Sequence, residues 1–504
     1  MEARDRLSML GWGEAAAFLR GPGLDRPAIV ETHTAVIHLT PSEAWKLRRP
    51  VDYGWLDYGS RAKRRACAAR EIALNAPAAS GLYLGLGGVD VSPQGGLRLL
   101  RPAADPDGLP ATAEPLVVMR RFAADALFSQ MAEAGKLDRR LLAQTGARVA
   151  ALHKAAPAAG AVDLAALVGA EAAEIARLGP VLGADLAAAL AEALLAEAAR
   201  RTEVATARHR RRCHGDLHLG NIVLWRGQPA PFDCIEFNDA IATVDPLYDL
   251  AFLTMDLRIR GLGGLRPAVL NAWAEALSRT PDPLVETAYG GLALLGLYEA
   301  VRASIRAKVT VLQGRPDQAC AYAEAALATL RAPPTPRLIA VGGRSGTGKS
   351  TLARALADRL QAVVLRSDAV RKGLLGVEET ARLPQAAYAA DISAQVAQAM
   401  RLRAAMALNG GWPVILDATH LEASQRAEAA ALAGELGLRF DGLWLDAPRA
   451  VLETRIAARR DDASDATLAV LARQMTQSAP EDWVHLCAQG APDGLAARAL
   501  AALC

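Results

Sequence analysis

One eight-residue segment constrains this chain more than any other. The sequence GRSGTGKS, residues 343–350, matches the pattern G-x-x-x-x-G-K-[ST] at every fixed position. Its glycines let backbone N–H groups surround phosphates, its lysine can reach the β- and γ-phosphate oxygens, and its last hydroxyl can bind Mg²⁺. We therefore expect an ATP and Mg²⁺ site built by Gly343, Gly346, Gly348, Lys349, Ser350 (also a Mg²⁺ ligand) and Thr351.

Strand-like and helix-like patterns alternate around this segment. Apolar RLIAVGG precedes it, helical STLARALADRLQ follows, and further apolar stretches occur at AVVLRSD, PVILDAT and FDGLWLDAP. Such alternation is typical of βαβ units around a parallel sheet. RAPPTPR, residues 331–337, ends the preceding Ala-rich helical pattern because its prolines cannot continue a helix. We expect a Pro-rich linker at 332–336 and an α/β domain with a parallel sheet at 337–504.

Candidate catalytic residues follow the strands of this domain. Asp368 ends a strand and Arg371 lies one helical turn later. A carboxylate there can accept a proton from a hydroxyl, and the arginine can hold a substrate anion. A helix N-cap is the alternative role for Asp368. Asp417 ends another strand in VILDAT and is a candidate Mg²⁺ ligand.

A later helical segment carries Arg455 and Arg459 four residues apart. Both could close over a transferring phosphoryl group and neutralise its developing charge. Pairing with Glu453 or Asp461 on a solvated helix face is the alternative.

These C-terminal motifs resemble the P-loop kinases related to polynucleotide 5′-hydroxyl kinase, zeta toxin and chloramphenicol phosphotransferase. The resemblance implies that Asp368 is a general base and that Arg371 binds the substrate.

A second motif, RCHGDLHLGN at residues 212–221, allows two interpretations. On an extended strand His214, Asp216 and His218 would share one face, as metal ligands would. The spacing favours a kinase catalytic loop instead, because Asn221 follows Asp216 by five residues and Asp233 follows the next apolar strand.

Lys46 and Glu71 are the remaining candidate residues for the site that the second motif indicates. Seven of the 57 basic residues are lysine, so composition alone favours arginine at a basic position. Lys46, amid arginines on a predicted strand within residues 28–50, departs from that composition. It stands where a strand lysine would contact the α- and β-phosphates. Glu71, on a predicted helix at about 60–75, is its candidate partner, with an exposed i,i+4 pair as the alternative. No G-x-G-x-x-G precedes Lys46, so the ETHTA turn, residues 31–35, must supply any phosphate cover.

The pattern H-G-D-x-H-x-x-N followed by F-D-x-x-E resembles the aminoglycoside and choline phosphotransferases, whose fold is similar to that of protein kinases. The resemblance implies that Asp216 is the base or orienter for the attacking hydroxyl. It also implies that Asn221 and Asp233 hold Mg²⁺, and that Asp249 is a structural acid. His214 and His218 would brace the loop.

Composition excludes several other classes of protein. The net charge of +3 over 504 residues gives no global field for nucleic acid or membranes. The six cysteines are scattered, which favours reduced thiols and a cytoplasmic location, and the sequence shows no export signal or membrane span. We expect neither a membrane partner nor an obligate protein partner.

Together the motifs predict a multidomain chain of α/β and α+β class. Residues 1–331 would form a protein-kinase-like domain with a small lobe at about 1–122 and a helical lobe at about 123–331. Both motif sets resemble bacterial bifunctional proteins that join an aminoglycoside-phosphotransferase-like kinase to a P-loop kinase-like domain. The expected function is phosphoryl transfer from ATP to hydroxyl groups of unidentified substrates at two centres. The alternative is a C-terminal 5′-hydroxyl kinase for nucleic acid or nucleotides, regulated by an N-terminal pseudokinase.

Overall fold

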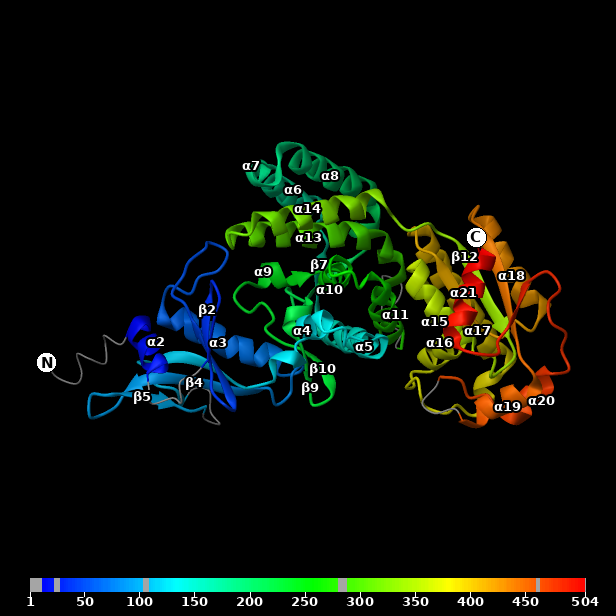
Figure 1. Cartoon of the computed structure of the whole chain (residues 1–504), viewed down its shortest axis with the longest axis horizontal. Coiled ribbons are helices and arrows are strands. Elements are labelled where there is room, and N and C mark those ends of the chain that lie inside the picture. Colours follow the sequence, from blue (N-terminus) through cyan, green and yellow to red (C-terminus); the bar gives the residue numbers. More distant parts are fainter. Residues whose placement is uncertain (1–10, 22–27, 103–107, 280–287, 459–462, 504) are drawn as a thin grey trace. The chain divides into compact units, whose positions relative to one another are not determined.

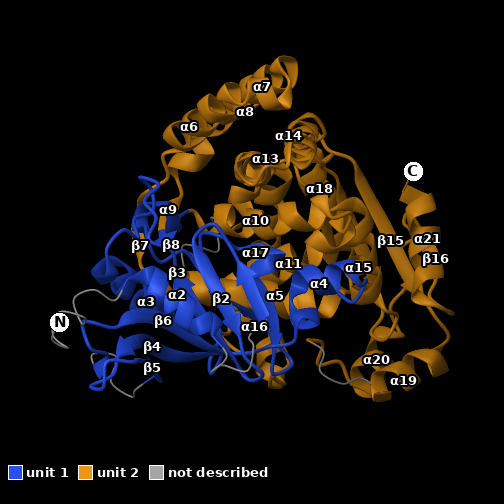
Figure 2. Ribbon diagram, turned by 60° about the vertical axis from the view of Figure 1, so that its left-hand side comes forward, with its two compact units in different colours: residues 1–137, 211–244 blue, residues 138–210, 245–504 orange. Residues whose placement is uncertain are grey.

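The computed structural model describes residues 11–21, 28–102, 108–279, 288–458 and 463–503 (Figure 1). They form two compact units (Figure 2). Unit 1 comprises residues 1–137 and 211–244, and unit 2 comprises residues 138–210 and 245–504. The helical part of the predicted first domain thus lies in the same unit as the predicted C-terminal domain.

Unit 1 contains a six-stranded antiparallel sheet in the order β1-β2-β3-β6-β4-β5. The strands and helix predicted in residues 28–50, 60–75 and 116–122 are confirmed. The elements of this part are α2 (Trp12–Arg20), β1 (Ala28–Glu31), β2 (Ala35–Leu39), β3 (Glu43–Arg48), α3 (Arg61–Asn75), β4 (Tyr83–Val91), β5 (Leu97–Leu100) and β6 (Glu114–Arg120).

The two helices cover opposite faces of this sheet. Trp45 and Leu47 of β3 pack in one apolar cluster with Leu19 of α2. Ala44 of β3 packs in another with Ala68 of α3. Because successive side chains of a strand point to opposite faces, Lys46 and Arg48 join Ala44 on the side of α3.

The segment 211–244 returns to unit 1 and brings the second motif together. The strands β9 and β10 form an antiparallel hairpin whose turn holds Arg226 and Gly227 at positive φ. Asn221 precedes β9 and Phe232 follows β10, and the Phe232 N–H donates to the Asn221 carbonyl at 3.0 Å. The hairpin therefore places Asp233 beside the end of the catalytic loop. Two short helices precede this segment in unit 1, η2 (Ala124–Ala126) and α4 (Phe128–Glu133). The elements of the segment, the first of which begins two residues before it, are β8 (His209–Arg212), η3 (Leu219–Asn221), β9 (Ile222–Trp225), β10 (Gln228–Pro231), α9 (Asp239–Ala242) and β11 (Thr243–Val244).

The first part of unit 2 is helical, as the Ala- and Leu-rich composition predicted. Helices α5 and α11 pack closely at Gly146, where a Cβ atom would lie 2.3 Å from the Val269 carbonyl oxygen. The elements are α5 (Arg139–Ala155), β7 (Ala158–Ala161), α6 (Leu164–Arg177), α7 (Gly179–Leu182), α8 (Ala184–Thr206), α10 (Pro246–Ile259), η4 (Gly263–Leu265), α11 (Arg266–Leu277), η5 (Gly291–Leu294), α13 (Leu295–Leu312) and α14 (Pro316–Arg331).

The second part of unit 2 is built on the predicted parallel sheet, with five strands in the order β13-β14-β12-β15-β16. Ile339 and Val341 of β12 pack in one apolar cluster with residues of α15 and α21, whereas Ala340 packs with Trp444 and Trp483. The elements are β12 (Leu338–Gly343), α15 (Lys349–Leu360), β13 (Val363–Arg366), α16 (Ser367–Leu374), η6 (Gln385–Tyr388), α17 (Ala390–Asn409), β14 (Val414–Asp417), α18 (Ala423–Glu435), β15 (Phe440–Asp446), α19 (Arg449–Ala458), α20 (Leu468–Gln474), β16 (Val484–Cys487) and α21 (Pro492–Leu503).

Helix α11 covers the edge strand β13 of this sheet. The Asn271 side chain donates to the Ala362 carbonyl at 3.1 Å and accepts from the Val364 N–H at 2.7 Å. An amide side chain can replace a neighbouring strand in this way because it offers one donor and one acceptor. Asn271 therefore provides hydrogen-bond partners for backbone groups of this edge, which would otherwise be unpaired.

Among the described residues, no helix is both long enough and apolar enough to cross a lipid bilayer.

Candidate active sites

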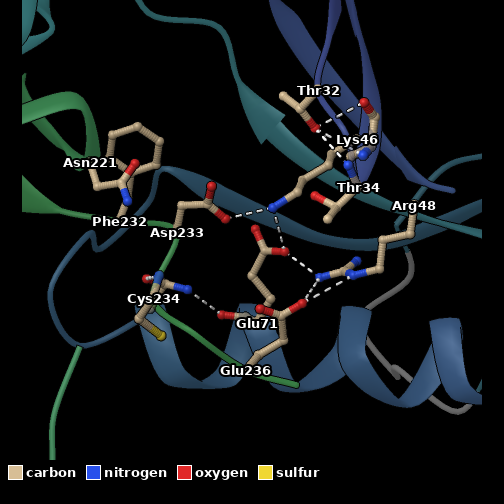
Figure 3. A network of polar contacts seen from close by, with 12 residues as sticks. Thr32, Thr34, Lys46, Arg48, Glu71, Asn221, Phe232, Asp233, Cys234 and Glu236 are labelled. Atoms are coloured by element: carbon tan, nitrogen blue, oxygen red, sulfur yellow. Dashed lines mark hydrogen bonds and ion pairs between the residues drawn. The ribbon is translucent and has the colours of Figure 1, made fainter. Parts of the chain in front are cut away.

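The N-terminal site is centred on Lys46 of β3, which is 9% exposed. Its Nζ lies 3.0 Å from Glu71 Oε2 and 2.5 Å from Asp233 Oδ1 (Figure 3). Burial alone would lower the pKa of Lys46, but Asp233 and Glu71 outweigh it and raise that pKa. Lys46 is therefore a fixed cation, held between a helix and the segment after β10.

Glu71 of α3 is fully buried, so the alternative of an exposed helix pair is wrong. Burial raises the pKa of its carboxyl, while Lys46 and Arg48 act in the opposite direction. Arg48 donates to the same Glu71 oxygen that accepts from Lys46. Tyr83 OH lies 3.4 Å from the other oxygen.

The catalytic-loop motif is a compact turn before β9. The Asn221 side-chain nitrogen donates to both the carbonyl and the carboxylate Oδ2 of Asp216, each at 2.9 Å. His214 Nε2 contacts the Phe232 carbonyl at 2.9 Å, and His218 Nδ1 accepts from the Gly220 N–H at 3.0 Å. His218 thus holds backbone of the loop, and His214 ties the loop to the segment after β10, which fits the bracing role that the resemblance implied.

Asn221 and Asp233 offer the oxygen ligands that Mg²⁺ prefers. The Asn221 nitrogen is used within the loop, which leaves its amide oxygen as the atom it can present to a cation. Burial would raise the pKa of Asp233, but Lys46 outweighs it and lowers that pKa, so the carboxylate is ionised. Its side chain is still 40% exposed. The backbone bond from Phe232 to Asn221 holds the two segments together, and a carboxylate and an amide oxygen are ligand types that fit a divalent cation.

Two further predicted features lie elsewhere. Asp249 of α10 is fully buried in unit 2 and lies 3.0 Å from His153 Nε2, which fits the structural role implied for it.

The β1–β2 turn holds no glycine, and Thr32 Oγ1 accepts from the Ala35 N–H at 2.9 Å. The turn is thus shaped by a threonine side chain (Figure 3).

The second site lies at the carboxyl ends of the strands in the parallel sheet. Gly346 and Gly348 have φ of +86° and +91°, a conformation that side chains disfavour. A Cβ atom on Gly343 would lie 2.5 Å from the Leu445 carbonyl oxygen. The loop delivers Lys349, Ser350 and Thr351 as the first residues of α15.

Lys349 Nζ donates to the Arg344 carbonyl oxygen at 3.1 Å, so the lysine lies against its own loop. Arg344 in turn lies 3.2 Å from Asp446 at the end of β15 and donates to the Gln477 carbonyl at 2.8 Å. The Ser345 N–H donates to Gln474 Oε1 at 2.8 Å. Neighbouring segments therefore support the predicted phosphate loop from outside.

Asp368 lies in the first turn of α16, and the N-cap position belongs to Arg366. The alternative N-cap role for Asp368 is therefore wrong. Burial raises the pKa of Asp368 and the nearby Asp417 adds to that rise, against the opposing effects of a hydrogen bond with Ser464 and of Arg366. A carboxylate with a raised pKa is better matched to accepting a proton than an ordinary aspartate.

Arg371 is buried on the next turn of α16, at 9% exposure. Its Nη1 donates to the Ala387 carbonyl at 2.8 Å and to Ser393 Oγ at 3.3 Å, and its guanidinium lies 4.7 Å from the centre of the Tyr388 ring. The Tyr388 hydroxyl donates to Asp465 at 2.8 Å. Arg371 therefore holds the segment from Ala387 to Ser393 in place.

Asp417 ends β14 and is 4% exposed. Its Oδ2 lies 3.4 Å from Arg366 Nε. His420 follows in a left-handed conformation, with φ of 49°, and its ring centre lies 5.4 Å from that of Trp483. Burial lowers the pKa of His420 to about 4, so the imidazole beneath this site is neutral.

Arg455 of α19 bonds to main-chain oxygens. Its Nη2 donates to the Ala488 carbonyl at 2.9 Å, and its Nη1 lies 3.5 Å from the Gly346 and Thr347 carbonyls. Glu453 pairs with Arg449 instead, so the alternative pairing of Arg455 with Glu453 is not found. Arg459 and Asp461 lie outside the described residues.

Sequence reasoning missed several residues that complete these sites. Arg48, Tyr58 and Glu236 form a buried group beside Lys46. Ser464 and Asp465 bring the segment after α19 to α16. The motif F-D-x-x-E includes Glu236, and this motif is the sequence signal that could have identified that residue.

Two family models match the chain. The phosphotransferase enzyme family matches residues 91–284, and an AAA domain matches residues 338–480. The first match includes the catalytic loop and Asp233, and the second includes the phosphate loop, Asp368 and Asp417. The matches and the two sites define a kinase, an enzyme that transfers a phosphoryl group to a hydroxyl.

Uncharacterized proteins of Mycobacterium tuberculosis and Mycobacterium bovis are 32% identical over 488 residues, which cover 92% of this chain and 93% of theirs. The chain belongs to the same family as these mycobacterial proteins, and it joins a phosphotransferase domain to a P-loop kinase domain.

Solved structures are similar to parts of the chain. Glucosamine kinase in complex with glucosamine, ADP and inorganic phosphate is 16% identical, with a TM-score of 0.39 over 60% of this chain and 75% of that chain. Aminoglycoside 2′-phosphotransferase-IIIa is 14% identical, with a TM-score of 0.38 over 63% and 97%. The APS kinase of Mycobacterium tuberculosis is 22% identical, with a TM-score of 0.27 over 34% and 99%.

Proposed function

We propose that the protein transfers the γ-phosphoryl group of ATP, bound with Mg²⁺, to hydroxyl acceptors at two separate centres. The observation that carries the N-terminal centre is the convergence of Lys46, Glu71 and Asp233 from three distant segments. Asn221 lies in the loop that leads into the same hairpin. Phosphoryl transfer depends mainly on positioning and charge stabilisation, and these groups supply both.

Each residue of the N-terminal centre has a role in this proposal. Lys46 would bind nucleotide phosphates, and Asn221 and Asp233 would hold Mg²⁺, which neutralises charge on the phosphates when it is bound. Asp216 would orient the acceptor hydroxyl and take its proton. The Asn221 amide already fixes the Asp216 carboxylate, so this group is placed before any substrate arrives.

The C-terminal centre is proposed on the phosphate loop and Asp368. Backbone N–H groups of the loop and of the first turn of α15 would bind phosphates together with Lys349, and Ser350 and Asp417 would support Mg²⁺. Asp368 would accept the proton of the acceptor hydroxyl. Arg371 would keep the acceptor side of the site in place.

The test is phosphoryl transfer from γ-labelled ATP to a panel of small alcohols, sugars, nucleosides and oligonucleotides by the full-length protein. Asp216→Ala and Lys349→Ala should each abolish a different set of products. If Asp216→Ala leaves every product unchanged while Lys349→Ala removes all of them, unit 1 is not a catalytic centre. That result would support the alternative, a C-terminal kinase regulated by an N-terminal pseudokinase.

A further inference from the structure

Strand β3 carries a second buried cation, Arg48, on the same face as Lys46 and with 2% exposure. Arg48 Nη2 donates to Glu71 Oε2, the oxygen that also accepts from Lys46 Nζ. The same arginine donates to Glu236 Oε1, from Nη2 at 2.9 Å and from Nε at 3.2 Å. One arginine therefore joins two buried carboxylates (Figure 3).

Glu236 connects this arginine to the segment that carries Asp233. It follows Asp233 by three residues, is 4% exposed, and accepts a hydrogen bond from Tyr58 OH at 2.6 Å. Tyr58 lies just before α3. The group formed by Arg48, Glu71, Glu236 and Tyr58 thus links β3, α3 and the segment after β10.

The arrangement gives the buried Glu71 carboxylate two positively charged partners, Lys46 and Arg48. Lys46 pairs with two carboxylates, Glu71 and Asp233. In the proposed function Lys46 would turn toward phosphates when Asp233 holds a metal ion. A fully buried Glu71 that relied on Lys46 alone would lose part of its compensation at that moment, which is unfavourable for a buried charge. Arg48 also donates to Glu71, so this carboxylate has a second cation besides Lys46.

We propose that Arg48 and Glu236 are positioning residues of the N-terminal centre: Arg48 holds Glu71 while Lys46 exchanges Asp233 for nucleotide phosphates, and Glu236 fixes Arg48 to the Asp233 segment. This inference rests on the proposed function, because it requires nucleotide binding at this centre. Neither residue needs to touch the nucleotide.

The experiment measures the dissociation constant of Mg²⁺–AMPPNP by calorimetry on the full-length chain. Every protein carries Lys349→Ala, so that binding at the phosphate loop of unit 2 does not contribute. Arg48→Met should raise the dissociation constant by about 10- to 100-fold, the usual cost of removing a group that orients a ligand-binding residue. Arg48→Lys should bind more tightly than Arg48→Met, because it restores a cation beside Glu71.

The chain offers a matched control on the same helix. Arg64 of α3 is 5% exposed and pairs with the fully buried Glu114, with Nη2 at 2.8 Å from Oε2. Its Nη1 donates to the main-chain carbonyls of Tyr58 and Gly59, and not to the carboxylates that Arg48 joins. Arg64→Met should lower the unfolding temperature and leave the dissociation constant unchanged. The same pattern in Arg48→Met would show a merely structural role and overturn the inference.

Two further outcomes are decisive. If Arg48→Met does not fold, Glu236→Gln decides, because it keeps the shape and an acceptor oxygen but removes the charge; an unchanged dissociation constant in that variant overturns the inference. If the chain with Lys349→Ala alone binds no Mg²⁺–AMPPNP, the proposed function of unit 1 fails and the inference fails with it.

Discussion

Lys46 and Lys349 are the phosphate-binding lysines of the two proposed centres, and the protein holds them in different ways. Lys46 is buried and paired with Glu71 and Asp233, from two other segments. Lys349 donates to a main-chain carbonyl of its own loop, that of Arg344. The first lysine forms ion pairs with carboxylates of other segments, and the second forms a hydrogen bond within its own loop and lies within electrostatic reach of Asp368.

This difference predicts different requirements for nucleotide binding. In unit 1, a metal ion on Asp233 would release Lys46 for phosphates, so metal and nucleotide binding should be strongly coupled. In the phosphate loop, Gly346 and Gly348 already have the positive φ angles that a phosphate-binding loop uses, so less rearrangement is needed.

Asp216→Asn should remove the proton acceptor of the N-terminal centre and keep the hydrogen bond from Asn221. We expect kcat for the products of this centre to fall by roughly 10²- to 10⁴-fold, the usual contribution of a general base. Initial rates with labelled ATP measure the effect, and products of the other centre serve as the internal control. Equal loss at both centres would mean that the two are not separate.

Lys349→Ala should act only on the C-terminal centre. Removing a cation that stabilises the transferring phosphoryl group costs roughly 10²- to 10³-fold in kcat. Lys308 of α13 makes a suitable control, because it is a lysine of the same unit that pairs with Glu171 of α6 at 2.5 Å. A comparable loss in Lys308→Ala would argue against a specific role for Lys349.

The parallel-sheet part of unit 2 should be sensitive to acid through His420. Its pKa of about 4 in the folded state is below the ordinary 6.5, so the unfolded state binds the proton more readily. The corresponding free energy of folding is present above pH 6.5 and is lost as the pH falls toward 4, by up to about 3 kcal/mol. Urea unfolding at pH 7 and pH 4.5 measures it.

His420→Asn is the matched variant, because asparagine tolerates the left-handed backbone found at this position. The variant should lose less free energy of unfolding between the two pH values than the unsubstituted chain does. An equal loss in both proteins would mean that His420 does not titrate in this range.

Asn271→Ala should produce the smallest effect. It removes two hydrogen bonds from the edge of β13, which should lower the free energy of unfolding of the C-terminal part by about 1–3 kcal/mol. Hydrogen exchange of the Val364 amide would report the change directly. Nucleotide binding at Lys46 in unit 1 should not change, whereas a change there would show that the two centres share a support.

Local patterns were sufficient to predict most of the fold. Apolar strands before GRSGTGKS and after CHGDLHLGN placed β12 and β9, and the Arg-rich composition made Lys46 and Lys349 stand out. The spacing from Asp216 to Asn221 predicted a contact that the structure contains. Motif residues that act within a few positions of each other are predictable because the local backbone fixes their geometry.

Long-range partners were not predictable in the same way. Arg48 and Glu236 are 188 residues apart, and an arginine beside Lys46 had no distinguishing signal among many arginines. Arg455 was placed correctly on a helix, but its guanidinium binds the Ala488 carbonyl, next to the strand β16 that the sequence patterns did not reveal. The direction of a side chain depends on neighbours that only the folded chain supplies.

The contact between Asn271 and β13 also bears on how the protein is synthesised. A ribosome makes α11 before it makes the first strand of the parallel sheet, and domains generally fold as units from the N-terminal end. The helical segment that pairs with the open edge is therefore already present when β13 emerges. A newly made sheet edge can pair with its own chain before it meets the edge of another molecule, which reduces the opportunity for aggregation.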